Sequence, residues 1–252
     1  CAQGRRGMEG EFGMNFQKAF PGQEIYFVKL GCSGSSISTW TSDDGHNWDY
    51  FYEKMWKPAA DSLLAMGKKP RLAGIWWMQG CSDRANDSAY YHTRLAEVVN
   101  NCRTKLGFPD AKVYIGLVVK PGESATNPEA STQFGEGVRA AQIAATTPGA
   151  PGAIENTVLI DTRDCPFQGD QLHFNHVGIN RIGRRLAEKV VADGRDNWAP
   201  FTTPGEWKEA EDGSFSFVPY FGKPEITYGN TAEGRRAALL DYGCWSEIIE
   251  MP

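Results

Sequence analysis

The residue pair best suited to catalysis lies late in the chain, where Asp170 precedes His173 by three positions. Within one turn, a carboxylate at this spacing can orient an imidazole ring and stabilise its protonated form. The other ring nitrogen is then free to act as a general base. The same spacing also arises by chance in surface turns. The pair is a stronger candidate here because it lies between an expected strand and an expected helix.

Two further segments carry groups that suit a developing negative charge. Gln79 ends a strongly apolar run and precedes a glycine, so its side-chain amide is a candidate donor to an oxyanion. Gly34 lies in the small polar loop 31–38, where a missing side chain lets backbone N–H groups approach a ligand. Either feature alone is equally typical of a turn or a strand end. The loop is not a GxSxG nucleophile turn, because Ser35 stands where the second glycine would be.

Strand-like and helix-like segments alternate along the first 198 residues. Short runs rich in β-branched and aromatic residues predict strands at 24–30, 72–78, 112–119 and 157–161. Apolar residues at helical spacing predict helices at 12–20, 50–66, 130–146 and 177–192. A further helix is expected to begin after a cap at Asn86 or Asp87 and to run to about Leu106, with Gly107 after it. Single helices between strands imply βαβ units. We therefore predict an α/β fold, a three-layer α/β/α sandwich with a mostly parallel sheet.

A parallel sheet brings together the loops that follow its strands. Right-handed crossovers place these loops on one edge, and ligands of such sheets bind outside the carboxyl ends of the strands. Loops 31–38, 79–83 and 162–173 should therefore converge. Gly34, Gln79 and the Asp170–His173 pair would then line one site.

The character of the sequence changes after Trp198. Residues 199–252 are rich in glycine, proline and aromatic residues, with strand-like runs at 215–221 and 225–228 and a helical signal at 232–240. We predict a main domain of residues 1–198 and a C-terminal extension, residues 199–252, packed on it. A small separate β-unit is the alternative.

Composition excludes several classes of partner. The net charge is -5 and the basic residues are scattered, so a nucleic-acid partner is not expected. No apolar run approaches the ~18–20 residues of a membrane-spanning helix, so no membrane partner is expected. Histidine and cysteine show no metal-ligand spacing, and we predict neither a metal nor another cofactor.

The chain has six cysteines and none of them forms a CxxC pair. An even number without metal spacing favours disulfides in an oxidising compartment, and hence an extracellular, secreted protein. Six buried thiols in a cytosolic protein are the alternative.

Taken in order, these motifs resemble the SGNH-hydrolase superfamily, in its sialate O-acetylesterase-like and acetyl xylan esterase branch (carbohydrate esterase family six). The resemblance rests on EFG at 11–13, WMQGCSD at 77–83 and DQLHFN at 170–175, and it spans roughly residues 7–191. It implies an SGNH/flavodoxin-like sheet. It also implies hydrolysis of acetyl esters on sugar hydroxyls through an acyl-serine intermediate.

The resemblance also implies roles for individual residues. His173 would be the general base and Asp170 its orienting partner, with the Gly34 N–H and the Gln79 side chain as oxyanion donors. For the acetylated carbohydrate, the predicted contacts are Ser35, Trp40 and Trp77. Trp40, Trp48 and Trp56 could together form a wall that stacks on sugar rings, although indoles at this spacing are more often part of a core.

The sequence departs from the family pattern at two places. The family nucleophile sits in a GQSN-type motif after a first strand, upstream of the EFG motif, and neither that strand nor that motif is present. Cys81 replaces the usual glutamate of QGExD, and we expect it to form a disulfide with Cys32 across the site edge.

Three explanations of the missing serine are open. We favour a longer or cleaved polypeptide, in which a separate N-terminal segment carries the nucleophile. A circular permutation would instead take a strand and Ser246 from residues 237–249. The third is a non-catalytic carbohydrate-binding or structural domain on an esterase scaffold. Ser33, Ser35 and Ser36 are not expected to act as nucleophiles.

Overall fold

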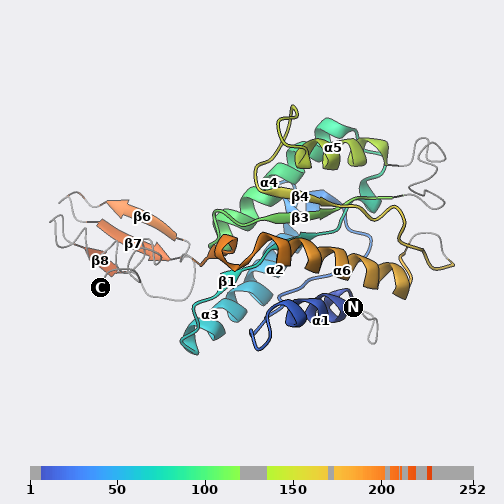
Figure 1. The fold of residues 1–252 in the computed structure, drawn as a ribbon. Coiled ribbons are helices and arrows are strands. Elements are labelled where there is room, and N and C mark those ends of the chain that lie inside the picture. The colour runs from blue at the N-terminus through green and yellow to red at the C-terminus, as the bar shows by residue number, and fades with distance from the viewer. Residues whose placement is uncertain are drawn as a thin grey trace.

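A parallel three-stranded sheet forms the centre of the molecule (Figure 1). The computed structural model describes residues 7–119, 135–169, 173–201, 205–209, 211, 215–219 and 226–228. The sheet has the order β2-β3-β4, with bounds Ile75–Trp77, Val113–Gly116 and Thr157–Ile160. The predicted strand 72–78 is divided, because its first residue, Leu72, belongs to a separate strand, β1 (Arg71–Leu72).

Helices cover both faces of the sheet (Figure 1). One face carries α4 (Ser88–Leu106) and α5 (Glu136–Thr146), and the other carries α1 (Glu9–Ala19) and α6 (His176–Asp193). Local signals set the ends of these helices. The Asp87 side chain caps α4 by accepting from the Tyr90 N–H at 2.7 Å, and Gly107 ends it in a left-handed conformation, with φ +83°.

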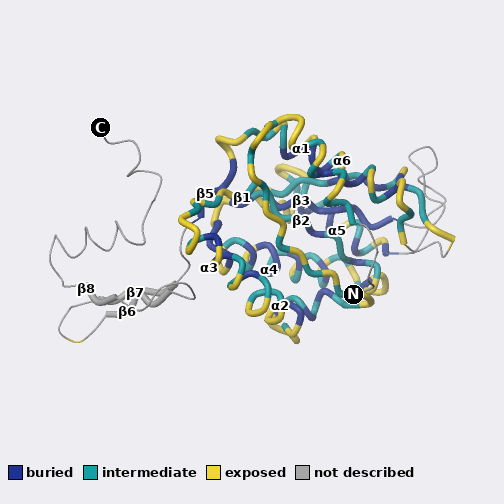
Figure 2. Tube along the Cα trace, turned by 90° about the horizontal axis from the view of Figure 1, so that it is seen from below, coloured by how far each residue is buried: buried dark blue, intermediate teal, exposed yellow. Residues whose placement is uncertain are grey.

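Two apolar clusters lie on opposite faces of the sheet, because alternate residues of a strand point to opposite sides. On β3, Val113 and Ile115 join the cluster beneath α4 and α5, whereas Tyr114 joins the cluster beneath α1 and α6. Buried residues run through the middle of the α/β domain and exposed ones follow its outer turns (Figure 2). The predicted three-layer α/β/α sandwich is therefore confirmed.

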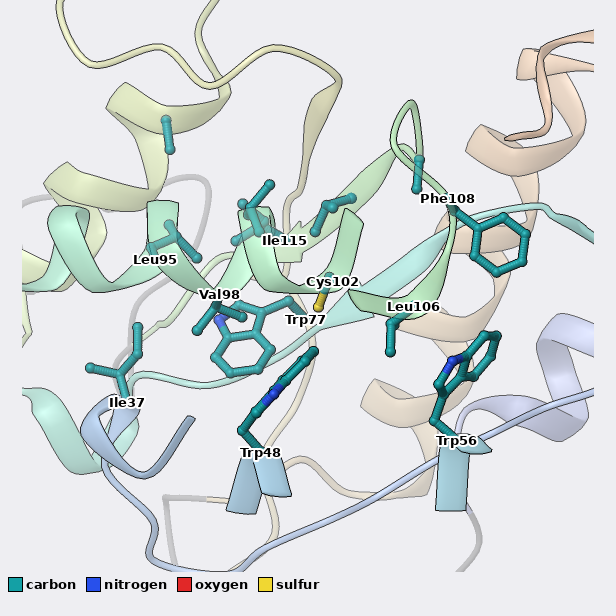
Figure 3. Packing of buried hydrophobic residues seen from close by; sticks show 14 of the residues in the cluster. Ile37, Trp48, Trp56, Trp77, Leu95, Val98, Cys102, Leu106, Phe108 and Ile115 are labelled. Atoms are coloured by element: carbon teal, nitrogen blue, oxygen red, sulfur yellow. The ribbon is translucent and has the colours of Figure 1, made fainter. Parts of the chain in front are cut away.

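The tryptophans after loop 31–38 belong to the cluster beneath α4. The predicted helix 50–66 is made of α2 (His46–Phe51), a π-helical turn (Tyr52–Trp56) and α3 (Lys57–Ala65). Trp48 and Trp56 are buried among α4 side chains, and Trp56 packs edge-on against Phe108 (Figure 3). These two indoles are core residues and do not form a sugar-stacking wall.

Residues 24–30 do not form the strand that their composition predicts. The segment has no regular secondary structure, and it has no ladder partner within the described ranges. Ile25 packs against the α1–α6 cluster and Val28 against the α4–α5 cluster, as the two faces of a sheet strand would. Tyr26 and Phe27 are 51% and 47% exposed. The segment thus has the side-chain alternation of a strand without the backbone hydrogen bonds.

The chain after Trp198 first pairs with the main domain. Its strand β5 (Ala199–Pro200) runs antiparallel to β1, and Phe201 packs edge-on against Phe108. A second, antiparallel sheet follows, with the order β6-β7-β8 and bounds Gly205–Glu209, Phe215–Pro219 and Ile226–Tyr228. The strand β6 was not predicted. The predicted helix 232–240 lies outside the described residues.

None of the helices that the structure describes is both long enough and apolar enough to cross a bilayer.

Candidate active site

Loop 31–38 and the end of β2 meet at the carboxyl edge of the sheet, as predicted. The Gln79 side-chain nitrogen Nε2 donates to the Ser35 carbonyl oxygen at 3.1 Å and also to the Asp83 carboxylate. Both N–H groups of the amide therefore have acceptors within the protein. As an oxyanion donor, Gln79 would have to share or exchange its bond to Ser35.

Asp83 is the polar centre of this region. Its side chain is only 2% exposed, and it accepts hydrogen bonds from four groups. Besides Gln79, the donors are the Ser36 hydroxyl at 2.7 Å, the Ile37 backbone N–H at 2.8 Å and the Asn86 amide at 2.9 Å. The four donors satisfy a buried carboxylate that would otherwise be very unfavourable.

Two fully buried side chains form hydrogen bonds to Gln79. The Tyr91 hydroxyl lies 2.9 Å from the Gln79 carbonyl oxygen and 3.0 Å from its side-chain Oε1, and can donate to either. Burial raises the pKa of Tyr91, so the hydroxyl stays protonated. Gln142 donates to the same carbonyl at 3.1 Å and accepts from the Val118 N–H at 2.9 Å.

Sequence reasoning missed Asp83, Tyr91 and Gln142 as parts of the site. Asp83 had a signal, since it ends the WMQGCSD motif. Tyr91 and Gln142 had none, because they lie on the sheet-facing sides of α4 and α5 among apolar neighbours.

Gly34 presents its backbone to solvent at this edge. It is left-handed, with φ +67°, and its N–H makes no hydrogen bond within the described residues. The neighbouring hydroxyls are occupied: Ser35 Oγ donates to the Cys32 carbonyl at 3.2 Å and Ser36 Oγ donates to Asp83. None of the described residues therefore occupies the Gly34 N–H, which can donate to an incoming acceptor.

His173 lies in the loop after β4, on the same edge of the sheet. The base of this loop is closed by stacking of Phe167 on Phe174, with ring centroids 4.9 Å apart, and by a 2.7 Å bond from the Gln168 N–H to the His173 carbonyl. The His173 side chain is exposed. Asp170 lies outside the described residues, so its partnership with His173 stays a prediction.

An arginine of α6 anchors the beginning of the His173 loop through hydrogen bonds. Arg185 donates to the Asp161 carbonyl at 2.6 Å and to both carboxylate oxygens of Asp164, at 2.5 and 2.7 Å. The hydrogen bond from Arg185 lowers the pKa of Asp164. This ion pair ties the segment after β4 to the helix that follows the His173 loop.

We expect Arg185→Leu to lower the free energy of unfolding at pH 7 by about 1 kcal/mol, because the pair is partly exposed. A carboxyl with a lowered pKa stabilises the fold above its unfolded pKa of about 3.9, and this stabilisation is lost as pH falls through the folded pKa. The gap between wild type and variant should therefore narrow as pH falls below the unfolded pKa and through the lowered folded pKa of Asp164. Urea unfolding at pH 7 and at acid pH measures the gap, with Lys189→Leu, an exposed position of α6, as the control. An equal gap at both pH values would contradict the assignment.

The predicted substrate contacts differ in exposure. Trp77 is 7% exposed and packs edge-on against Trp40, with ring centroids 5.4 Å apart. Figure 3 shows Trp77 beside Val98 of α4, within the core. This packing is typical of a structural side chain. Trp40 and Ser35 are half-buried, and substrate contact by any of the three stays a prediction.

The expected disulfide between Cys32 and Cys81 is wrong, because both are free thiols, as are Cys102 and Cys165. Cys81 packs against the α4–α5 cluster, and burial raises the pKa of its thiol. Cys1 and Cys244 lie outside the described residues.

No group of three or more His, Cys, Asp or Glu side chains suited to a metal ion occurs in the described part of the chain.

The layers and the parallel strand order define a three-layer α/β fold. The profile of a family described as "carbohydrate esterase, sialic acid-specific acetylesterase" matches residues 3–192. The chain belongs to this carbohydrate esterase family. A crystal structure of an Arabidopsis thaliana protein is similar in fold, with a TM-score of 0.54 and 20% identity over 72% of this chain and 67% of that one. A search of curated proteins found no match.

Proposed function

We propose that this chain is the larger part of a carbohydrate O-acetyl esterase, completed by a separate N-terminal segment that carries the serine nucleophile. Family membership supports esterase activity. The observation that carries the proposal is the pair of candidate donors, Gln79 and the Gly34 N–H, held together beside a strand edge that has no partner among the described residues.

That edge belongs to β2. Within the described residues, β2 pairs with β3 alone, and its other edge has no ladder partner. Residues 24–30 likewise have no strand partner among the described residues, although their side chains reach both apolar clusters. An added strand between the two segments would give both of them hydrogen-bonding partners. A serine at the carboxyl end of that strand would then lie next to the end of β2.

In the completed site, the serine hydroxyl would attack the acetyl carbonyl carbon while His173 accepts its proton. The oxygen that becomes negative would accept hydrogen bonds from Gly34 and Gln79, which lowers the barrier. His173 would return the proton to the departing sugar hydroxyl. A water molecule, activated by His173 in the same way, would then hydrolyse the acyl-serine and release acetate.

The test compares the 252-residue chain with the same chain carrying its natural upstream sequence, using an aryl acetate and an acetylated sugar as substrates. We expect little or no hydrolysis by the chain alone and clear hydrolysis by the extended protein. If the chain alone hydrolyses these substrates, and substitution of Ser33, Ser35, Ser36 or Ser246 abolishes the activity, that serine is the nucleophile. The proposed upstream nucleophile would then be wrong.

The competing proposal is a non-catalytic carbohydrate-binding or structural domain. It is favoured by the satisfied state of the Gln79 amide, whose two N–H groups already have protein acceptors. It predicts sugar binding without acetate release from the extended protein. An extracellular location stays a prediction, and it loses the support of the Cys32–Cys81 pair.

A further inference from the structure

We propose that Asp83 is the positioning residue of this site, and that it holds both candidate oxyanion donors in place. This role rests on the proposed function, but its structural part can be tested without catalysis. The donors to be aligned are the Gln79 amide and the backbone around Gly34. Asp83 is hydrogen-bonded to the first directly and to the second through Ser36 and Ile37.

The two carboxylate oxygens divide their partners. Oδ2 accepts from the Ile37 N–H and from Gln79 Nε2, and Oδ1 accepts from Ser36 Oγ and Asn86 Nδ2. An ionised carboxylate accepts at every lone pair and donates at none, so it fits four donors at once.

This arrangement determines which way the Gln79 amide faces. Nε2 lies toward the carboxylate, and Oε1 lies 3.0 Å from the Tyr91 hydroxyl. A flipped amide would place Oε1 against a carboxylate oxygen, which is repulsive. Asp83 therefore keeps an N–H group of Gln79, and not its oxygen, on the side of loop 31–38.

The same carboxylate anchors that loop. The Ile37 N–H, three residues after Gly34, is bound to Oδ2 in a fully buried position. A backbone N–H cannot rotate away from its acceptor as a hydroxyl can. Asp83, 46 residues further along the chain from Ile37, thus fixes the loop relative to Gln79 together with the direct bond from Gln79 to the Ser35 carbonyl.

Kinetics of the extended protein test the catalytic part. Asp83→Ala should lower kcat at least as much as Gln79→Ala, about 10²–10³-fold for one lost oxyanion donor, with little change in KM. Since the two residues act on the same donor, the double variant should be no slower than Asp83→Ala. A double variant whose loss is the product of the single losses would overturn the proposal.

Asp83→Asn is the conservative variant. Its amide nitrogen can face Ser36 and Asn86, whose hydroxyl and amide can turn to accept, so its oxygen can stay on Ile37 and Gln79. We expect a loss in kcat of only about tenfold, because a neutral acceptor binds more weakly than a carboxylate. If Asp83→Ala does not fold, this variant carries the test. A kcat equal to that of wild type would then overturn the proposal.

Hydrogen exchange of the Ile37 amide, followed by NMR, tests the structural part without any substrate. Asp83→Ala should accelerate this exchange by about tenfold or more, since the amide loses its acceptor. The matched control is Asp193→Ala, which removes a largely buried carboxylate paired with Lys112 at the far end of α6. Asp193→Ala should leave Ile37 unchanged.

These outcomes separate the two proposals. If the extended protein releases no acetate, the proposed esterase function fails, while Asp83 is still judged by the exchange of Ile37. If Asp83→Ala leaves this exchange at the wild-type rate, the positioning role is wrong whether or not the protein is an esterase.

Discussion

His173→Ala in the extended protein is expected to lower kcat by about 10⁴–10⁶-fold, the range found when a member of a Ser-His-Asp triad is disabled. The reason is that His173 would both accept the serine proton and return it to the leaving sugar hydroxyl. KM should change little, because the imidazole acts mainly in the transition state. Initial rates with an aryl acetate measure the effect.

The matched control is His176→Ala. His176 is also exposed and lies three residues later, as the first residue of α6, outside the His173 loop. It should retain kcat within about threefold, since most surface substitutions have small effects. Equal losses in the two variants would show that His173 is not the base.

Gly80→Ala is expected to lower the free energy of unfolding by about 2–6 kcal/mol, from backbone strain and overpacking together. Gly80 has φ +136°, a conformation that side-chain-bearing residues rarely adopt. An added Cβ would lie 2.7 Å from methyl carbons of both Val118 and Val138 and 3.3 Å from the Tyr91 hydroxyl. The affected atoms belong to the core directly beneath Gln79. Urea unfolding followed by circular dichroism measures the loss.

Gly67→Ala separates strain from crowding. Gly67 also has a positive φ, +70°, but an added Cβ would meet no atom within 4 Å. Gly67→Ala should lower the free energy of unfolding by only about 1 kcal/mol, the lower end of the range for a left-handed residue with a side chain. A loss at Gly80 no larger than that at Gly67 would show that the contacts with Val118 and Val138 relax without cost.

Sequence reasoning and structure agree best where the cause is local. The Asp87 cap, the Gly107 stop and the helical periodicity of residues 177–192 each depend on neighbours within a few positions, and α4 and α6 lie close to their predicted bounds. Sequence reasoning and structure disagree where an element depends on residues that are far away in the sequence. A run such as residues 24–30 has strong strand composition, but a strand needs hydrogen bonds from another segment, and none of the described residues supplies them.

The site shows the same division. The motifs around Gln79 and His173, and their placement after strands, could be predicted, because parallel strands send their loops to one edge. The acceptors of the Gln79 amide could not, nor could the thiol state of Cys32 and Cys81, whose side chains are placed by packing.

By itself, the sequence determined the α/β layering, the family and the meeting of loop 31–38 with the end of β2 at the sheet edge, since periodicity, turn residues and short motifs are properties of adjacent residues. Only the tertiary structure decided that Asp83 gathers donors from Ser36, Ile37 and Asn86 as well as Gln79, and that Tyr91 and Gln142 support Gln79 from two helices. The physical reason is that a buried polar group must find its partners wherever the fold places them, at separations along the chain that no local pattern records.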